Sequence, residues 1–226
     1  MYFMVDINKK IIFGWSAKCW CSHIKSIFYF LQTDNVTNKI HTAKDKNILP
    51  DDIENYTTII FTRNPYKRII SGFLDKYPKG GQYRKLWKDS FLSFNKFVDE
   101  LIKYKWKQIE IHHFTPQTTE MFDKKIMQSK TIKFYDISSI DYEYIEQLYD
   151  KQIPLCVINK KFGHERINSQ NYYNKYVYDL NIDDYIGYNV DLKYFYNDTI
   201  KENIYNFYIN DFILFKENGI DYTTQF

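Results

Sequence analysis

Two stretches of the chain share one pattern, in which a short apolar or β-branched run is followed by a polar loop and then by apolar residues at helical spacing. The first run covers residues 11–13 and ends at Gly14, and the second covers residues 57–62, where all but one residue are β-branched. Both runs predict buried strands. Behind each loop the spacing predicts an amphipathic helix, whose apolar positions are Ile24, Ile27, Phe28 and Leu31 in the first case and Ile69, Ile70 and Phe73 in the second.

The remaining pattern predicts a strand over residues 131–135 and helices over residues 91–104, 142–149 and 198–215. Residues 39–42 are expected to form a short strand, and residues 50–52 to open a turn or short helix. Residues 154–196 have weak periodicity and are expected to form loops and short turns. Residues 111–117 should be irregular, because Pro116 disfavours the helical conformation at the residue before it.

The alternation of strands and helices predicts an α/β fold, a parallel sheet with helices on its faces. At 226 residues the chain is expected to be one domain, residues 1–226. Ligands of such folds bind at the carboxyl ends of the strands, where both polar loops fall.

Composition excludes several classes of protein. Apolar residues make up 44% of the chain and charged residues 26%, which is typical of a globular protein. The net charge of +3 is small and dispersed, so no nucleic-acid partner is expected. No apolar stretch approaches the roughly 18 residues of a membrane span, and no signal peptide is visible. We therefore expect a cytoplasmic protein without a membrane span.

The three cysteines, Cys19, Cys21 and Cys156, are an odd number and do not indicate a disulfide framework. Cys19 and Cys21 lie close to His23, but a structural zinc site needs a fourth ligand and a recognised spacing. No metal is expected.

The loop after the first strand has the character of an anion site. A loop that leads into a helix aims backbone N–H groups and a positive dipole end at one point, and here Lys18 lies in the loop and Ser22 begins the helix. The nucleotide-binding Walker motif needs glycines around the phosphates and a lysine directly before the serine or threonine. This loop has no glycine, and Lys18 precedes Ser22 by four positions, which disfavours an ordinary NTPase or kinase.

Residues 18–25 (Lys-Cys-Trp-Cys-Ser-His-Ile-Lys) resemble the phosphosulfate-binding loop of sulfotransferases, and most closely that of carbohydrate-type members, Lys-x-Ala/Gly-Cys-Thr/Ser-x-x-Lys. Trp20 departs from this pattern, which usually has a small residue there. Residues 63–73 match the family's 3′-phosphate element, Arg-x-Pro-x-x-Arg-x-x-Ser-x-Phe/Tyr, at every defined position. The two motifs in this order form a specific signal, whereas either alone is weak.

Two further segments extend the resemblance to the last helix. Residues 113–117 (His-Phe-Thr-Pro-Gln) resemble the His-x-x-Pro segment before the family's fourth strand, and residues 205–215 resemble its closing helix. In carbohydrate-type members a histidine from this region is a candidate catalytic base, which here is His113, with His112 as the alternative. Imidazole suits this role because its ordinary pKa of about 6.5 lets it take a proton near neutral pH.

The resemblance implies a P-loop-NTPase-like sulfotransferase fold and an enzyme that transfers a sulfuryl group from 3′-phosphoadenosine 5′-phosphosulfate to a hydroxyl acceptor, expected to be a carbohydrate. Lys18 and His113 or His112 are the catalytic candidates, with Ser22 and the loop amides at the 5′-phosphate and Arg63 and Ser71 at the 3′-phosphate. The donor-binding candidates are Lys18, Cys21, Ser22, His23, Lys25, Arg63 and Ser71.

Other interpretations stay open. A loop covering the donor would include His164 and Arg166. Lys25 and Arg68 are interpreted primarily as surface or helix-face charges. The alternative functions are a nucleotide-dependent phosphotransferase of P-loop ancestry and a non-catalytic protein that holds an anionic glycan. The acceptor and the oligomeric state are left undetermined.

Overall fold

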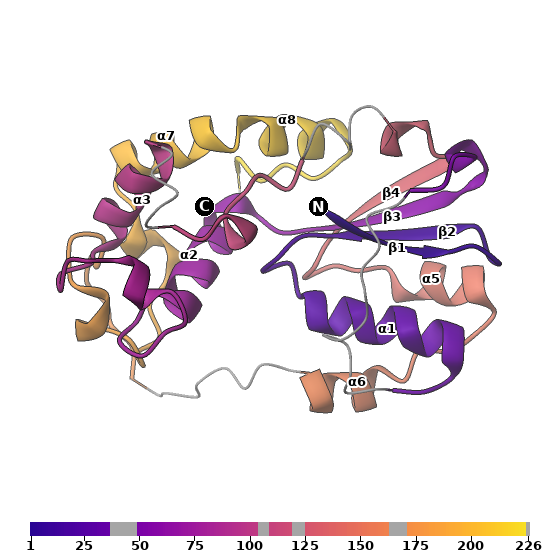
Figure 1. The fold of residues 1–226 in the computed structure, drawn as a ribbon, viewed down its shortest axis with the longest axis horizontal. Coiled ribbons are helices and arrows are strands. Elements are labelled where there is room, and N and C mark those ends of the chain that lie inside the picture. Colours follow the sequence, from indigo (N-terminus) through magenta and orange to yellow (C-terminus); the bar gives the residue numbers. More distant parts are fainter. Residues whose placement is uncertain (37–48, 104–108, 119–124, 163–170, 225–226) are drawn as a thin grey trace. The chain divides into compact units, whose positions relative to one another are not determined.

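The computed structural model describes residues 1–36, 49–103, 109–118, 125–162 and 171–224 (Figure 1). The contacts of the chain group it into two compact units. We call the unit of Met1–Arg63, Gln117–His164 and Glu217–Ile220 the sheet unit. The helical unit consists of Asn64–Pro116, Glu165–Lys216 and Asp221–Phe226. A single domain over the whole chain stays a prediction.

The sheet unit contains a four-stranded sheet of β1 (Tyr2–Asp6), β2 (Ile11–Trp15), β3 (Thr57–Thr62) and β4 (Thr131–Asp136), in that spatial order. Strands β2, β3 and β4 are parallel, and β1 pairs antiparallel with β2. The predicted α/β fold is confirmed, and the predicted parallel arrangement holds for β2, β3 and β4 but not for β1. The pattern gave no signal for β1, which is a five-residue edge strand.

Strand β2 is buried at all five positions, as expected for an inner strand. Gly14 leaves room for the packing here, because a Cβ atom at this position would lie 2.5 Å from the Cδ1 atom of Ile60 on β3 and would force that side chain to shift. Because β2 and β3 run parallel, the loops that follow them leave from the same edge of the sheet.

Helices α1 (Cys21–Thr33), α5 (Tyr142–Tyr149) and α6 (Leu155–Phe162) lie on one face of the sheet (Figure 1). The first two confirm the helical predictions. The prediction of loops from residue 154 onward is wrong for α6. Among residues 155–159, whose side chains the structure describes, Ile158 belongs to the buried core and Leu155 packs against it, so this short helix gives little apolar periodicity. The core beneath these helices is formed by Met4, Ile11, Phe13, Trp15, Ile24, Ile27, Phe28, Leu31, Ile59, Phe61, Ile145, Tyr149, Ile153 and Ile158.

The helical unit contains α2 (Pro65–Lys76), α3 (Phe94–Ile102), α7 (Asp198–Phe207) and most of α8 (Ile209–Glu217). As predicted, α2 has proline in its first turn, and the Asn64 side chain accepts a hydrogen bond from the Tyr66 amide at its start. The first residues of the predicted 91–104 helix lie outside α3, because Ser93 caps the helix through the amide of Lys96.

The prediction of one helix over residues 198–215 is wrong, because the chain breaks at Tyr208 into α7 and α8. The Tyr208 hydroxyl donates a 2.6 Å hydrogen bond to the Phe114 carbonyl. Its side chain is buried, so this tertiary bond fixes the residue at the break. Apolar spacing alone runs through the break and cannot reveal it.

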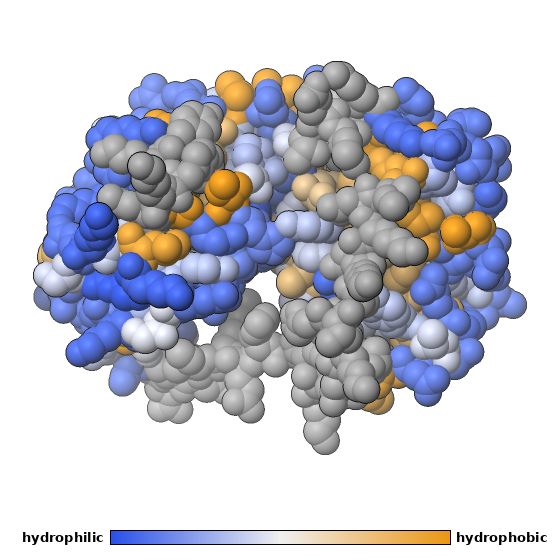
Figure 2. All heavy atoms as spheres, in the orientation of Figure 1, coloured by the Kyte–Doolittle hydropathy of each residue, from blue (hydrophilic) through white to orange (hydrophobic). Residues whose placement is uncertain are grey.

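Short 3₁₀ helices complete the described chain: η1 (Ile53–Asn55), η2 (Arg84–Leu86), η3 (Ile111–His113), η4 (Ile126–Gln128), η5 (Ile182–Asp184) and η6 (Leu192–Phe195). The predicted strand at 39–42 and the residues His164 and Arg166 lie outside the described residues. Within the described ranges, no helix has the length and apolar character that crossing a membrane requires. The face drawn in Figure 2 is mostly hydrophilic, with hydrophobic residues in small patches.

Candidate active site

The loop between β2 and α1 turns without glycine. Lys18 and Trp20 both have left-handed backbone conformations, with φ of 68° and 56°, and the Cys19 amide donates a 3.0 Å hydrogen bond to the Ser16 carbonyl. A left-handed conformation costs a non-glycine residue about 1–2 kcal/mol. The loop therefore stores backbone strain at the two residues that bracket Cys19, as functional loops often do.

The N-terminus of α1 faces this loop without a negative partner of its own. Trp20 is the N-cap residue and gives no side-chain cap, and no acidic residue occurs in the first turn. The Trp20 carbonyl accepts hydrogen bonds from the amides of His23 (3.0 Å) and Ile24 (3.1 Å). Ser22 and Cys21 lie in this first turn and are partly exposed. A helix end of this kind favours an anion.

Several buried polar atoms of residues 15–26 have no hydrogen-bond partner in the described part of the chain, and two of them belong to the loop and the first turn of α1. They are the Ser16 hydroxyl and the Nδ1 atom of His23. Buried polar groups are nearly always satisfied in folded proteins, so these two atoms are candidates for contact with a ligand or with water.

Trp20 covers His23. The two rings are parallel within 7°, and their centroids lie 3.8 Å apart. The Nε2 atom of His23 is 3.0 Å from the Tyr142 hydroxyl on α5, and burial lowers the pKa of His23 to about 4. At neutral pH His23 is therefore an uncharged hydrogen-bonding group, not a cation.

Arg63, which directly follows β3, contacts the loop after β2. Its Nη1 atom donates a 2.8 Å hydrogen bond to the Lys18 carbonyl. The structure thus brings together the basic residues of the two predicted phosphate motifs at one edge of the sheet. The contact places a guanidinium group beside the anion-favouring end of α1, where Lys18 also lies.

A third residue joins these loops. The buried side chain of Gln117 accepts hydrogen bonds from the Arg63 amide (3.0 Å) and the Cys19 thiol (3.0 Å), and its Nε2 atom donates to the Arg63 carbonyl (2.8 Å). The sequence interpretation missed this residue, although it ends the His-x-x-Pro-Gln segment that the resemblance covers.

Lys25 and Arg68 are not surface charges, and this interpretation is wrong. Both are buried. The Lys25 ammonium lies 4.4 Å from the centre of the Trp15 ring, and the Arg68 guanidinium donates a 2.8 Å hydrogen bond to the Thr115 carbonyl. A cation–π contact and a carbonyl acceptor allow these charges to be buried.

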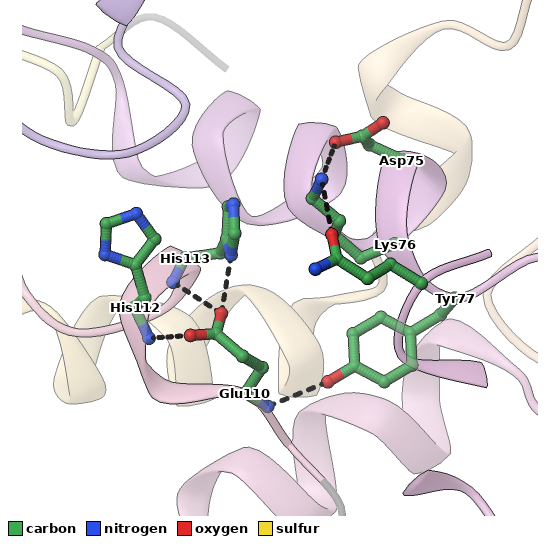
Figure 3. Close-up of polar contacts among 7 residues, drawn as sticks. Asp75, Lys76, Tyr77, Glu110, His112 and His113 are labelled. Carbon is green, nitrogen blue, oxygen red and sulfur yellow. Dashed lines mark hydrogen bonds and ion pairs between the residues drawn. The ribbon is translucent and has the colours of Figure 1, made fainter. Parts of the chain in front are cut away.

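In the helical unit, the two candidate bases lie around Glu110 (Figure 3). Glu110 caps η3, because its carboxylate accepts from the amides of His112 (2.7 Å) and His113 (3.1 Å). The same carboxylate is 2.5 Å from the Nδ1 atom of His113. In Figure 3 the His113 ring faces Glu110, whereas the His112 ring points away. The Glu110 amide in turn donates to the Tyr77 hydroxyl (3.0 Å).

This geometry distinguishes the two histidines. A carboxylate acceptor holds a proton on Nδ1 of His113 and leaves the Nε2 lone pair able to accept one. Burial lowers the pKa of His113 below its ordinary value, and Glu110 opposes this shift. The side chain is 14% exposed. His113 is therefore uncharged at neutral pH, oriented by Glu110 and partly exposed, which are properties that a general base needs.

The other predicted residues are located as follows. Ser71 lies on α2 in the helical unit and is partly exposed, so its pairing with Arg63 stays a prediction. Cys19, Cys21 and Cys156 form no disulfide. Within the ranges that the structure describes, no cluster of three or more His, Cys, Asp or Glu side chains could hold a metal ion.

A mostly parallel sheet with two basic loops at the ends of neighbouring strands is typical of α/β proteins that bind phosphate-bearing ligands. A family model described as "Sulfotransferase family" matches residues 1–216, and the chain belongs to this family. Its members are transferases. No match to a curated protein or to a solved structure was found.

Proposed function

We propose that the protein transfers a sulfuryl group from 3′-phosphoadenosine 5′-phosphosulfate to a hydroxyl group of a carbohydrate. The contact of the Arg63 guanidinium with the Lys18 carbonyl carries this proposal, because it joins the residues that match the family's two phosphate motifs. Membership of the sulfotransferase family supplies the reaction class.

The donor is proposed to bind at the loop after β2 and at Arg63. The uncapped N-terminus of α1, with Ser22 in its first turn, would hold the 5′-phosphosulfate by backbone N–H groups and dipole. Arg63 and Ser71 would hold the 3′-phosphate. The neutral imidazole of His23 would donate or accept a hydrogen bond here without adding charge, and Cys21 and Lys25 would support the loop.

The transfer forms a bond between the acceptor oxygen and sulfur and breaks the bond between sulfur and the bridging phosphate oxygen. The bridging oxygen leaves with the electron pair, as part of adenosine 3′,5′-bisphosphate. Lys18 would donate a hydrogen bond to this oxygen as charge develops on it. The acceptor hydroxyl would lose its proton to the Nε2 atom of His113, whose orientation Glu110 fixes. Most of the rate enhancement would come from positioning and charge stabilisation, as in phosphoryl transfer.

Ligand-specific stabilisation tests the donor. A ligand at a hundred times its Kd stabilises the folded state by about 2.7 kcal/mol, so adenosine 3′,5′-bisphosphate should raise the melting temperature clearly more than AMP or ATP does. Equal shifts for the three nucleotides would reject the donor assignment. A preference for ATP with magnesium would instead favour a phosphotransferase.

Turnover tests the acceptor. The purified protein is incubated with ³⁵S-labelled donor and a panel of neutral oligosaccharides, phenols and tyrosine peptides, and the labelled product is separated. Labelling of oligosaccharides is expected. Donor binding without labelling of any acceptor would favour a non-catalytic protein that binds anionic ligands.

A further inference from the structure

The side-chain amide of Gln117 binds both backbone groups of one residue. Its Oε1 atom accepts from the Arg63 amide at 3.0 Å, and its Nε2 atom donates to the Arg63 carbonyl at 2.8 Å. A neighbouring strand would make the same pair of bonds in a sheet. Arg63 is the first residue beyond β3, so Gln117 continues the bonding of that strand by one residue.

The same amide oxygen also reaches the other loop. It accepts a 3.0 Å hydrogen bond from the Cys19 thiol, and Cys19 lies between the two strained residues Lys18 and Trp20. Gln117 is fully buried. One amide group thus bonds to the backbone at Arg63 and to the centre of the loop after β2. The Arg63 guanidinium makes a second contact between the two loops, because it donates to the Lys18 carbonyl.

We propose that Gln117 is a positioning residue that sets the distance between the two phosphate-binding loops, and so makes the protein selective for nucleotides with phosphates at both the 5′ and the 3′ position. This inference rests on the proposed function, which takes the donor as the ligand that spans the two loops. Gln117 does not itself touch the ligand. It acts through the Arg63 backbone and through Cys19.

The chemistry of the contact requires an amide. The group must accept from two donors and donate to one carbonyl, which glutamine can do through its two ends. An ionised glutamate of the same size keeps the acceptor and loses the donor, which would leave the Arg63 carbonyl facing a negative charge. Methionine has nearly the same volume but neither function, so it would remove both hydrogen bonds to the Arg63 backbone.

The test compares three ligands by calorimetric titration: adenosine 3′,5′-bisphosphate, adenosine 5′-monophosphate and adenosine 3′-monophosphate. In the full chain, Gln117→Met and Gln117→Glu should weaken binding of the bisphosphate about tenfold or more, from the loss of one buried hydrogen-bonding group. Binding of each monophosphate, which uses one loop, should change about twofold or less on the same scale. The measured quantity is the selectivity ratio, which is the Kd of each monophosphate divided by the Kd of the bisphosphate. General destabilisation of the fold does not change this ratio.

Thr58→Val is the matched control. Thr58 is a buried residue of the same strand β3, and its hydroxyl lies 2.7 Å from that of Ser129. This variant also removes a partly buried hydrogen bond, near the start of the strand instead of beyond its end. It should lower the melting temperature and leave the selectivity ratio unchanged.

A second test uses the wild-type protein and measures alkylation of Cys19, so it does not depend on the folding of a variant. Cys19 is buried, so alkylation, located by mass spectrometry, reports opening of the loop. The bisphosphate should protect Cys19 much more than either monophosphate at equal occupancy.

The outcomes separate the two proposals. If the unmodified protein prefers the bisphosphate but the Gln117 variants keep this preference, the proposed function stands and the role of Gln117 is rejected. Loss of selectivity in Thr58→Val, or equal protection of Cys19 by all three nucleotides, also rejects that role. If the unmodified protein has no preference for the bisphosphate, both proposals fail.

Discussion

The indole ring of Trp20 lies flat on the imidazole ring of His23, with the ring centroids 3.8 Å apart and the planes within 7°. Trp20 was the one residue of the loop that the family pattern did not explain. The stack gives it a function, since it helps to exclude water from a histidine that is fully buried. A large residue at this position therefore forms part of the loop's packing.

The burial of His23 predicts a pH dependence of stability. The pKa of His23 is about 4 in the folded protein, below the ordinary value of 6.5, so the unfolded chain binds more protons between these values. The free energy of unfolding therefore decreases as the pH falls from about 6.5 to about 4. His23 contributes at most about 3 kcal/mol to this decrease. Urea unfolding of the wild type and of His23→Gln at pH 7 and pH 5 measures it.

The His23→Gln variant keeps a hydrogen-bonding group toward Tyr142 but does not titrate. The difference in stability between pH 7 and pH 5 should therefore be smaller in this variant than in the wild type. An equal difference in both proteins would mean that other groups cause the pH dependence.

The left-handed conformation of Trp20 predicts an order of stability for two substitutions. Trp20→Ala removes the ring stack and keeps the backbone strain at φ 56°. Trp20→Gly also removes the stack but adopts this conformation without strain. We expect both variants to be less stable than the wild type, and the glycine variant to be about 1 kcal/mol more stable than the alanine variant. Chemical denaturation at pH 7 measures this difference, and the reverse order would contradict the strain.

Some of these features could be predicted from the sequence and others could not. Strand β3 and helix α5 were predicted with their observed bounds, because β-branched runs and apolar spacing are local signals. The two basic loops were also found, since motif spacing and strand ends are visible in the chain. The bonds of Gln117 to Cys19 and Arg63 join residues far apart in the sequence, and the burial of Lys25 and Arg68 depends on tertiary partners. Local patterns carry no information on such contacts.

The hydrogen bond between His113 and Glu110 predicts the effects of substitutions on turnover. If the Nε2 atom of His113 takes the proton of the acceptor, His113→Ala should lower kcat about a hundredfold or more. His112→Ala should cost much less, because the His112 ring points away from Glu110 (Figure 3). Steady-state turnover with saturating donor measures both. A larger loss in His112→Ala would assign the base to His112.

Glu110→Gln tests the orientation of the base. Glu110 raises the pKa of His113 against the effect of burial, so removing its charge should lower this pKa further. The acid limb of the pH profile of kcat/KM should move to lower pH. At the same time kcat should fall, because an amide no longer fixes the proton on Nδ1. An unchanged profile would mean that Glu110 acts only as the cap of η3.

The contact between Arg63 and Lys18 predicts different kinetic effects for substitutions of the two residues. Arg63→Lys keeps a positive charge but loses the planar group that donates to the Lys18 carbonyl at 2.8 Å. It should weaken binding of adenosine 3′,5′-bisphosphate about tenfold, with a smaller effect on kcat. In contrast, Lys18→Ala keeps the carbonyl acceptor and removes the ammonium. It should lower kcat more than it weakens binding, because the ammonium is proposed to act on charge that develops in the transition state. Calorimetry and single-turnover kinetics separate the two effects. If both variants lose only binding affinity, Lys18 holds the donor without a role in the transfer.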